Sequence, residues 1–248
     1  MMKKIIGIFV ICFLGFIPIS KIYAFVYGDS VIKVTYKYSF TEPGRPEYND
    51  DEFLVIDGNK SFFFIGEGIK GKDGKIGARV VQLEDWGSHS LYFLGPMLPD
   101  YTLDDYWSDS LPAMKWTILN QFTTIKNNYC QKAVTTFRGR DYTVFFALNI
   151  PIQDGPWKFC GLPGLIVMGS DSKGIFKFEM TNFEKVPNDF NLGIGKVNGD
   201  YNRYKLLFKK WHLRRLEKDK ARKEAGPNCL GCGEGSNIRY VFYENLLD

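Results

Sequence analysis

The chain has 248 residues, of which 45% are hydrophobic, 16% aromatic and 24% charged, with a formal net charge of +4. This length and composition indicate a globular fold with one sizeable core and exclude a low-complexity or disordered chain. His89 and His212 are the only histidines, so few groups are present for imidazole-based catalysis or metal binding.

Residues 1–24 have the features of a secretory signal peptide. An apolar run follows Lys3 and Lys4 and ends shortly before Ala24, where cleavage is expected. The run is shorter than the roughly 20 apolar residues that span a bilayer. We therefore expect an exported protein of the periplasm or cell surface with a single β-rich domain over residues 25–248.

Alternation with a period of two residues dominates the next part of the chain. Residues 31–40 form the first such run, and residues 52–56 and 61–65 flank an Asp-Gly-Asn turn as a predicted hairpin. Residues 66–77 are expected to form a glycine and lysine loop. Further strands are expected at residues 78–83, 90–94, 115–125, 130–138, 142–148, 165–169 and 174–183.

An acidic stretch over residues 98–112 interrupts this pattern and is expected to be irregular. Its carboxylates, Asp104, Asp105 and Asp109, are interpreted as a solvated acidic loop. With this interruption, the pattern predicts a mainly β fold: a curved, half-barrel-like antiparallel sheet of about eight or nine strands.

One long helix is expected over residues 200–226, with Asp200 as its N-cap and Gly226-Pro227 as its stop. Its apolar side chains recur at one helical face, which should pack on the sheet. These are Tyr204, Leu207, Phe208 and Trp211. Residues 201–225 carry ten lysines and arginines against three acidic residues, which indicates either internal charge pairing or an anionic partner.

The middle of the chain carries a distinctive motif. Residues 155–166 read Gly-Pro-Trp-Lys-Phe-Cys-Gly-Leu-Pro-Gly-Leu-Ile, and residues 129–133, 137–140 and 150–152 accompany them upstream. In content, order and spacing this pattern resembles the GLPGLI family over residues 115–183. The resemblance implies a signal-bearing protein of Gram-negative envelopes whose molecular function is undefined.

The motif's glycines and prolines indicate tight turns, and its large apolar side chains indicate burial. We favour a structural corner. The alternative is a rim that contacts an apolar ligand or a partner, formed by Trp157, Phe159, Gly161, Leu162, Pro163, Gly164, Leu165 and Ile166. Arg138 and Arg140 flank Gly139 and are expected on one sheet face, either as solvated arginines or as a paired anion clamp.

Four cysteines follow the signal peptide: Cys130, Cys160, Cys229 and Cys232. An even number in an oxidising compartment indicates disulfides, and local pairing would join Cys130 to Cys160 and Cys229 to Cys232. For the Cys229/Cys232 pair, metal binding and redox chemistry are the alternatives.

The sequence contains no G-x-S-x-G elbow and no H-E-x-x-H motif, so we assign no catalytic residue and expect no cofactor or metal. We predict a non-enzymatic binding protein whose partner is an envelope protein or an apolar ligand, and no nucleic acid. A sheet interior filled by its own side chains would argue against the lipid-carrying form. The alternatives are a protein held at an anionic membrane surface by the basic helix, or a thiol or metal protein built on Cys229 and Cys232.

Overall fold

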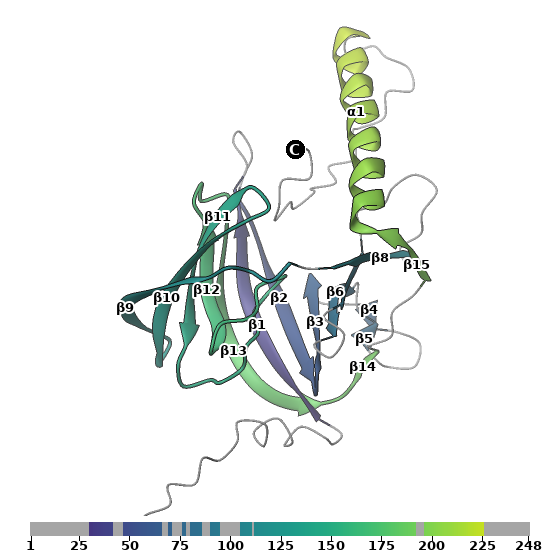
Figure 1. The fold of residues 1–248 in the computed structure, drawn as a ribbon. Coiled ribbons are helices and arrows are strands. Elements are labelled where there is room, and N and C mark those ends of the chain that lie inside the picture. Colours follow the sequence, from purple (N-terminus) through teal and green to yellow (C-terminus); the bar gives the residue numbers. More distant parts are fainter. Residues whose placement is uncertain are drawn as a thin grey trace, which may run out of the picture.

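The computed structural model describes residues 30–41, 47–65, 69–70, 76–77, 80–85, 90–94, 105–110, 112–191 and 196–225. The predicted signal peptide and the Cys229/Cys232 segment lie outside these residues. The strands are β1 (Ser30–Phe40), β2 (Tyr48–Asp57), β3 (Lys60–Ile65), β4 (Ile69–Lys70), β5 (Ile76–Gly77), β6 (Val80–Asp85), β7 (Ser90–Leu94), β8 (Asp105–Asp109), β9 (Thr117–Ile125), β10 (Asn128–Phe137), β11 (Arg140–Ala147), β12 (Leu165–Asp171), β13 (Phe176–Pro187), β14 (Phe190–Asn191) and β15 (Lys196–Asp200). They are followed by the helix α1 (Tyr201–Ala225) (Figure 1).

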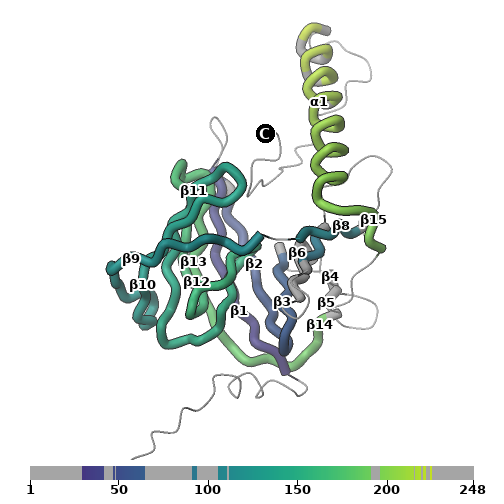
Figure 2. The backbone as a smooth tube through the Cα atoms, in the orientation of Figure 1, coloured from purple at the N-terminus to yellow at the C-terminus, as the bar shows by residue number. Residues whose placement is uncertain are grey.

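Most of these strands belong to one curved sheet. In the part of the chain that is described, it has 12 strands in the order β15-β8-β7-β6-β3-β2-β1-β13-β12-β11-β10-β9. The path of the backbone in Figure 2 shows how far the sheet curls. Strands β8 and β15 pair in parallel, whereas the β1, β2 and β13 ladders are antiparallel. The predicted mainly β, half-barrel-like fold with one long helix is confirmed, although the sheet has more strands than expected.

The hairpins on either side of β10 depend on turn residues with positive φ. Lys126 and Asn127 join β9 to β10 with φ of 43° and 67°, and Arg138 and Gly139 join β10 to β11 with φ of 47° and 75°. Two successive residues with positive φ give the type I′ turn, whose twist matches that of the paired strands. The tight second turn places Arg138 at the tip of its hairpin.

The acidic stretch over residues 98–112 was expected to be irregular, and this prediction is wrong for β8. Leu91 of β7 pairs with Asp109, and Lys196 of β15 pairs with Asp105. Tyr106 and Trp107 are buried. The aspartates at both ends of β8 give the segment an acidic composition, although its centre is aromatic and buried. Short strands β4 and β5 likewise lie within the predicted loop over residues 66–77.

The largest core cluster lies on the inner face of β1 and β10 to β13. Tyr36, Tyr142 and Phe178 project from the strands, and Trp157 and Phe159 of the motif pack over them. All five side chains are buried. The protein's own aromatic side chains therefore fill this part of the sheet interior.

Helix α1 begins as predicted. The backbone N–H of Arg203 donates to Asp200 Oδ1 at 2.9 Å, which is an N-cap hydrogen bond. Tyr204 and Phe208 are buried against Trp107 and its neighbours. From residue 213 onward, every described side chain is exposed, and Figure 1 shows the helix rising away from the sheet. No helix among the described residues combines the length and apolar character needed to cross a bilayer.

Candidate functional site

Residues 155–166, called the motif segment below, form a compact corner between β11 and β12. Three backbone hydrogen bonds tie the segment to the residues just before it. Gly161 N–H donates to the Gln153 carbonyl at 3.2 Å, Leu165 N–H to Ile150 at 2.9 Å, and Ile166 N–H to Asp154 at 2.9 Å. The corner thus satisfies much of its backbone locally, as a buried connection must.

The motif segment requires glycine at its different positions for different physical reasons. At Gly164 an added Cβ would lie 2.0 Å from the Ala147 carbonyl oxygen, so only glycine permits this approach of two backbones. Gly161 has a φ of 85° and open space around it. At Gly155 an added Cβ would lie 2.8 Å from the Ile166 Cβ, so the motif combines two steric requirements with one conformational requirement.

The large side chains of the motif segment point into the core. Of the residues predicted to form a rim, only Gly161 and Pro163 are exposed. Trp157 packs against Phe137 and Tyr142, with ring centroids 6.2 and 5.9 Å apart. These positions favour the structural corner over the apolar rim.

Trp157 has a φ of 55°, which is unusual for a bulky residue. The turn closes where Phe159 N–H donates to the Pro156 carbonyl at 3.3 Å. A left-handed conformation at a residue other than glycine costs about 1–2 kcal/mol, so the surrounding contacts must hold it. The turn directs the Trp157 ring into the core and leaves Lys158 facing β8.

Lys158 and Arg138 converge on one buried carboxylate. Arg138 binds Asp109 through two hydrogen bonds, Nη1 to Oδ2 at 2.9 Å and Nη2 to Oδ1 at 2.8 Å. Lys158 Nζ lies 3.0 Å from Asp109 Oδ2. The exposed fractions of the three side chains are 16% for Arg138, 2% for Asp109 and 3% for Lys158.

Aromatic rings surround these two cations. The Arg138 guanidinium carbon lies 3.8 Å from the centre of the Tyr201 ring, and Lys158 Nζ lies 5.2 Å from the same centre. Phe93 and Trp157 also face Lys158, at 5.4 and 5.5 Å. Such cation–π contacts are favourable when the charge is desolvated, so the rings compensate in part for two positive charges beside one negative charge.

The ionisation of Asp109 reflects this environment. Burial alone would raise its pKa, but the hydrogen bond from Arg138 and the charges of Lys158 and Arg138 outweigh burial and hold the pKa below its ordinary value. Asp109 is therefore a carboxylate at neutral pH, and the cluster is a true ion triad.

We call Asp109, Arg138, Lys158 and Tyr201 the junction cluster because it joins distant parts of the chain. In the sheet, β7, β6, β3, β2, β1, β13 and β12 separate β8 from β11. The cluster nevertheless joins β8 to the β10/β11 turn, to the motif segment and to the first residue of α1. Its contacts therefore stabilise both the curvature of the sheet and the position of the first turn of α1.

Several sequence-based expectations are corrected at this site. Asp109 is not a solvated loop residue, and Arg138 and Arg140 are neither solvated nor a joint anion clamp. Arg140 instead lies 3.7 Å from Asp171, with side-chain exposures of 11% and 0%. Lys158, the single charged residue of an otherwise apolar motif segment, was the available signal for a buried ion pair.

The predicted bridge between Cys130 and Cys160 is not found, since no disulfide joins the two cysteines in the structure. Cys130 Sγ donates instead to the Asn128 carbonyl at 3.2 Å. Burial raises the pKa of the Cys130 thiol, although a backbone hydrogen bond from Ile125 opposes this shift. The second predicted bridge, Cys229 to Cys232, lies outside the described residues.

The two thiols should therefore react at different rates. We expect iodoacetamide to label Cys160, which is half-buried, under native conditions, and to label buried Cys130 only after unfolding, because the thiolate is the reactive form. Peptide mapping by mass spectrometry measures both. A Cys130–Cys160 cross-linked peptide from protein purified under oxidising conditions would contradict this prediction.

Comparisons with known proteins concern the fold of the chain. No family model and no curated protein matches it, so the resemblance to the GLPGLI family stays a prediction. Among solved structures, PNGF-II in its C2 crystal form has a TM-score of 0.50 at 17% identity, over 72% of this chain and 32% of PNGF-II. The P21 form gives 0.49 at 16% identity, over 73% and 33%.

The chain therefore spans about a third of PNGF-II, and at this identity the likeness concerns the fold alone. A LolA superfamily protein, NE2245 from Nitrosomonas europaea, is also similar, with a TM-score of 0.29 at 10% identity, over 66% of this chain and 90% of that protein.

Proposed function

We propose that this is a non-enzymatic binding protein of the bacterial envelope that docks onto an anionic phospholipid surface through α1. The observation that carries the proposal is the contrast between the two parts of this helix. Its first residues are fixed to the sheet by the junction cluster and by Tyr204 and Phe208. Its later residues carry cationic and leucine side chains into solvent.

The exposed leucines of α1 lie near one another on the helix surface. Leu206, Leu213 and Leu216 have exposed fractions of 55%, 52% and 51%. At 100° per residue they fall within one side of the helix, and Lys209 and Lys220 lie between them. On such a face the leucines can enter the acyl boundary while the long side chains of the neighbouring lysines reach outward to the headgroups.

Rigidity at the base supports docking over a merely solvated helix. The buried ion triad and the ring of Tyr201 fix the helix axis relative to the sheet. A pre-oriented helix loses less conformational entropy on binding than a loose one. Under this proposal, the motif segment acts indirectly, because Lys158 helps to hold α1.

The inner face of the sheet is filled by the protein's own side chains, which argues against a lipid carrier. Trp157, Phe159 and Leu162 are buried where an acyl chain would have to lie in the β1 and β10 to β13 part of the sheet. Location in the envelope rests on the signal-peptide features of residues 1–24 and on the resemblance to the GLPGLI family.

Vesicle flotation tests the proposal. We expect the mature protein to float with phosphatidylglycerol vesicles at low salt, not with phosphatidylcholine vesicles, and to lose binding as salt screens the charges. Lys209→Gln with Lys220→Gln should weaken binding roughly 30-fold, at about 1 kcal/mol per lysine. Leu206→Gln with Leu213→Gln should weaken it through lost apolar burial.

The matched control is Lys60→Gln with Lys115→Gln, which removes the same charge from exposed positions away from α1. This variant should bind almost as the parent does. A parent protein that fails to float at low salt, or an equal loss in both double variants, would refute docking through α1.

A further inference from the structure

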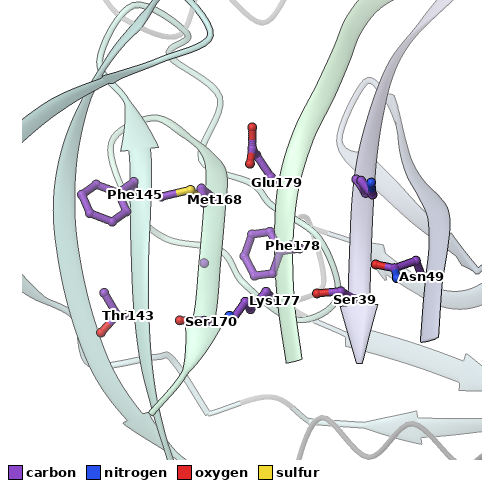
Figure 3. Close-up of a pocket in the computed structure, with 11 residues that line it drawn as sticks. Ser39, Asn49, Thr143, Phe145, Met168, Ser170, Lys177, Phe178 and Glu179 are labelled. Atoms are coloured by element: carbon purple, nitrogen blue, oxygen red, sulfur yellow. The ribbon is translucent and has the colours of Figure 1, made fainter. Parts of the chain in front are cut away.

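A separate groove lies on the outer face of the sheet, opposite the motif segment. Side chains of β1, β2, β11, β12 and β13 line a volume of about 330 Å³ (Figure 3). On β1, Lys37 and Ser39 face this groove because they alternate with Tyr36 and Tyr38, which are buried in the core. The volume is in the range of small-molecule sites.

The strand registers arrange the lining residues in two rows. Ser39 pairs with Lys177, Lys177 with Ser170, and Ser170 with Thr143. Asn49 of β2 pairs with Ser39 and extends this polar row. Figure 3 shows the polar row beside a second row that contains Glu179, Met168 and Phe145.

The side chains of the polar row have no hydrogen-bond or ion-pair partner among the described residues. This applies to Asn49, Ser39, Lys177, Ser170 and Thr143. Two threonine hydroxyls elsewhere on the sheet do have partners. Thr135 donates to the Lys115 carbonyl at 2.9 Å, and Thr181 donates to the Thr35 carbonyl at 3.2 Å. A row of one cation, three hydroxyls and an amide is thus left to face the groove.

Lys177 is the cation of the polar row, and the acidic residues near it lie beside other lysines. Glu179 pairs with Lys126 at 3.3 Å, and Asp51 lies opposite Lys37 in the register of β1 and β2. Lys177 has the hydroxyls of Ser39 and Ser170 on its two sides. A lysine flanked by hydroxyl donors suits a carboxylate, which can accept several hydrogen bonds at once.

The second row offers an apolar surface next to this cation. Met168 and Phe145 line the groove beside Ser170 and Thr143. We propose that the groove binds a small amphiphilic carboxylate, with its carboxylate on Lys177, Ser39 and Ser170 and its hydrocarbon part over Met168 and Phe145. The site is distinct from α1, so it stands whether or not α1 docks on lipid.

Titration of the ¹⁵N-labelled mature protein with sodium octanoate, below its micellar range, tests the site. We expect saturable shifts of the Lys177 and Ser170 amides. Acetate, which has the head group alone, and octanol, which has the chain alone, should each bind at least tenfold more weakly. Lys177→Gln should weaken octanoate binding about tenfold, and Met168→Gln should weaken it while leaving the weak acetate response unchanged.

Lys60→Gln is the matched control, since Lys60 lies at the β2/β3 turn and does not line the groove. It should bind octanoate as the parent does. Each variant must keep the parent's melting temperature, so that a loss of binding is not a loss of fold. Shifts that do not saturate, octanol binding as tight as octanoate, or an affinity unchanged in Lys177→Gln would each overturn the proposal.

Discussion

Replacement of Gly164 by alanine is expected to destabilise the protein by about 3 kcal/mol or more, near the top of the range for an added methyl group in packed structure. The new Cβ would lie 2.0 Å from the Ala147 carbonyl oxygen and 3.0 Å from the carbonyl carbon. Both atoms belong to the backbone, so no side-chain rotation relieves the contact. Urea unfolding followed by circular dichroism measures the change.

Gly161→Ala is the matched control within the same motif segment. Gly161 has a φ of 85° with nothing near its absent Cβ, so alanine there meets only conformational strain of about 1–2 kcal/mol. Gly164→Ala should therefore be clearly the more damaging of the two. Equal effects would mean that the close approach of the Gly164 and Ala147 backbones is not what requires glycine.

The parts of the fold that the sequence predicts are those fixed by local patterns. Alternation identifies β1, the β2/β3 hairpin and the strands from β9 to β13, because each hairpin also has suitable turn residues. The helix is predicted within one or two residues at each end, since Asp200 caps its start. Local chemistry alone determines these elements.

Non-local pairing could not be predicted in this way. Strand β8 has only five residues with acidic ends, and β15 pairs with it in parallel across a long separation in sequence. The antiparallel partner of β8, β7, lies ten residues away along the chain, so no tight turn sets the register of β8, and β15 has no hairpin partner among the described strands. The predicted loop therefore turned out to be a strand that the rest of the sheet stabilises.

The same limit explains the errors at the site. Arg138 and Arg140 are two residues apart, which suggested a shared role, yet a type I′ turn sends them to Asp109 and Asp171 respectively. Asp109 lies 49 residues from Lys158 in sequence. Only the curvature of the sheet brings these two residues together, and local sequence patterns do not predict that curvature.

The junction cluster gives the second large prediction. Asp109→Ala should destabilise the protein by about 3–5 kcal/mol, because it leaves Arg138 and Lys158 as two like charges with their shared carboxylate removed. Urea unfolding measures this loss. Hydrogen exchange should also show weaker protection of the α1 amides near Tyr204, since Tyr201 stacks on Arg138.

Lys158→Met is the informative comparison, because it keeps the Asp109–Arg138 pair with both of its hydrogen bonds. It makes the cluster neutral and should cost about 1.5–3 kcal/mol, the usual scale of a hydrogen bond to a charged group. Lys126→Met removes the exposed pair with Glu179, whose side chains are 45% and 46% exposed, and should cost at most about 1 kcal/mol.

This order of effects follows from desolvation: the carboxylate matters most because it compensates two buried cations, while each cation is compensated in part by aromatic rings. If Lys158→Met proved as damaging as Asp109→Ala, the lysine would be the essential member of the triad. The motif segment would then stabilise the base of α1 directly, by the charge of Lys158, and Arg138 would be the accessory cation.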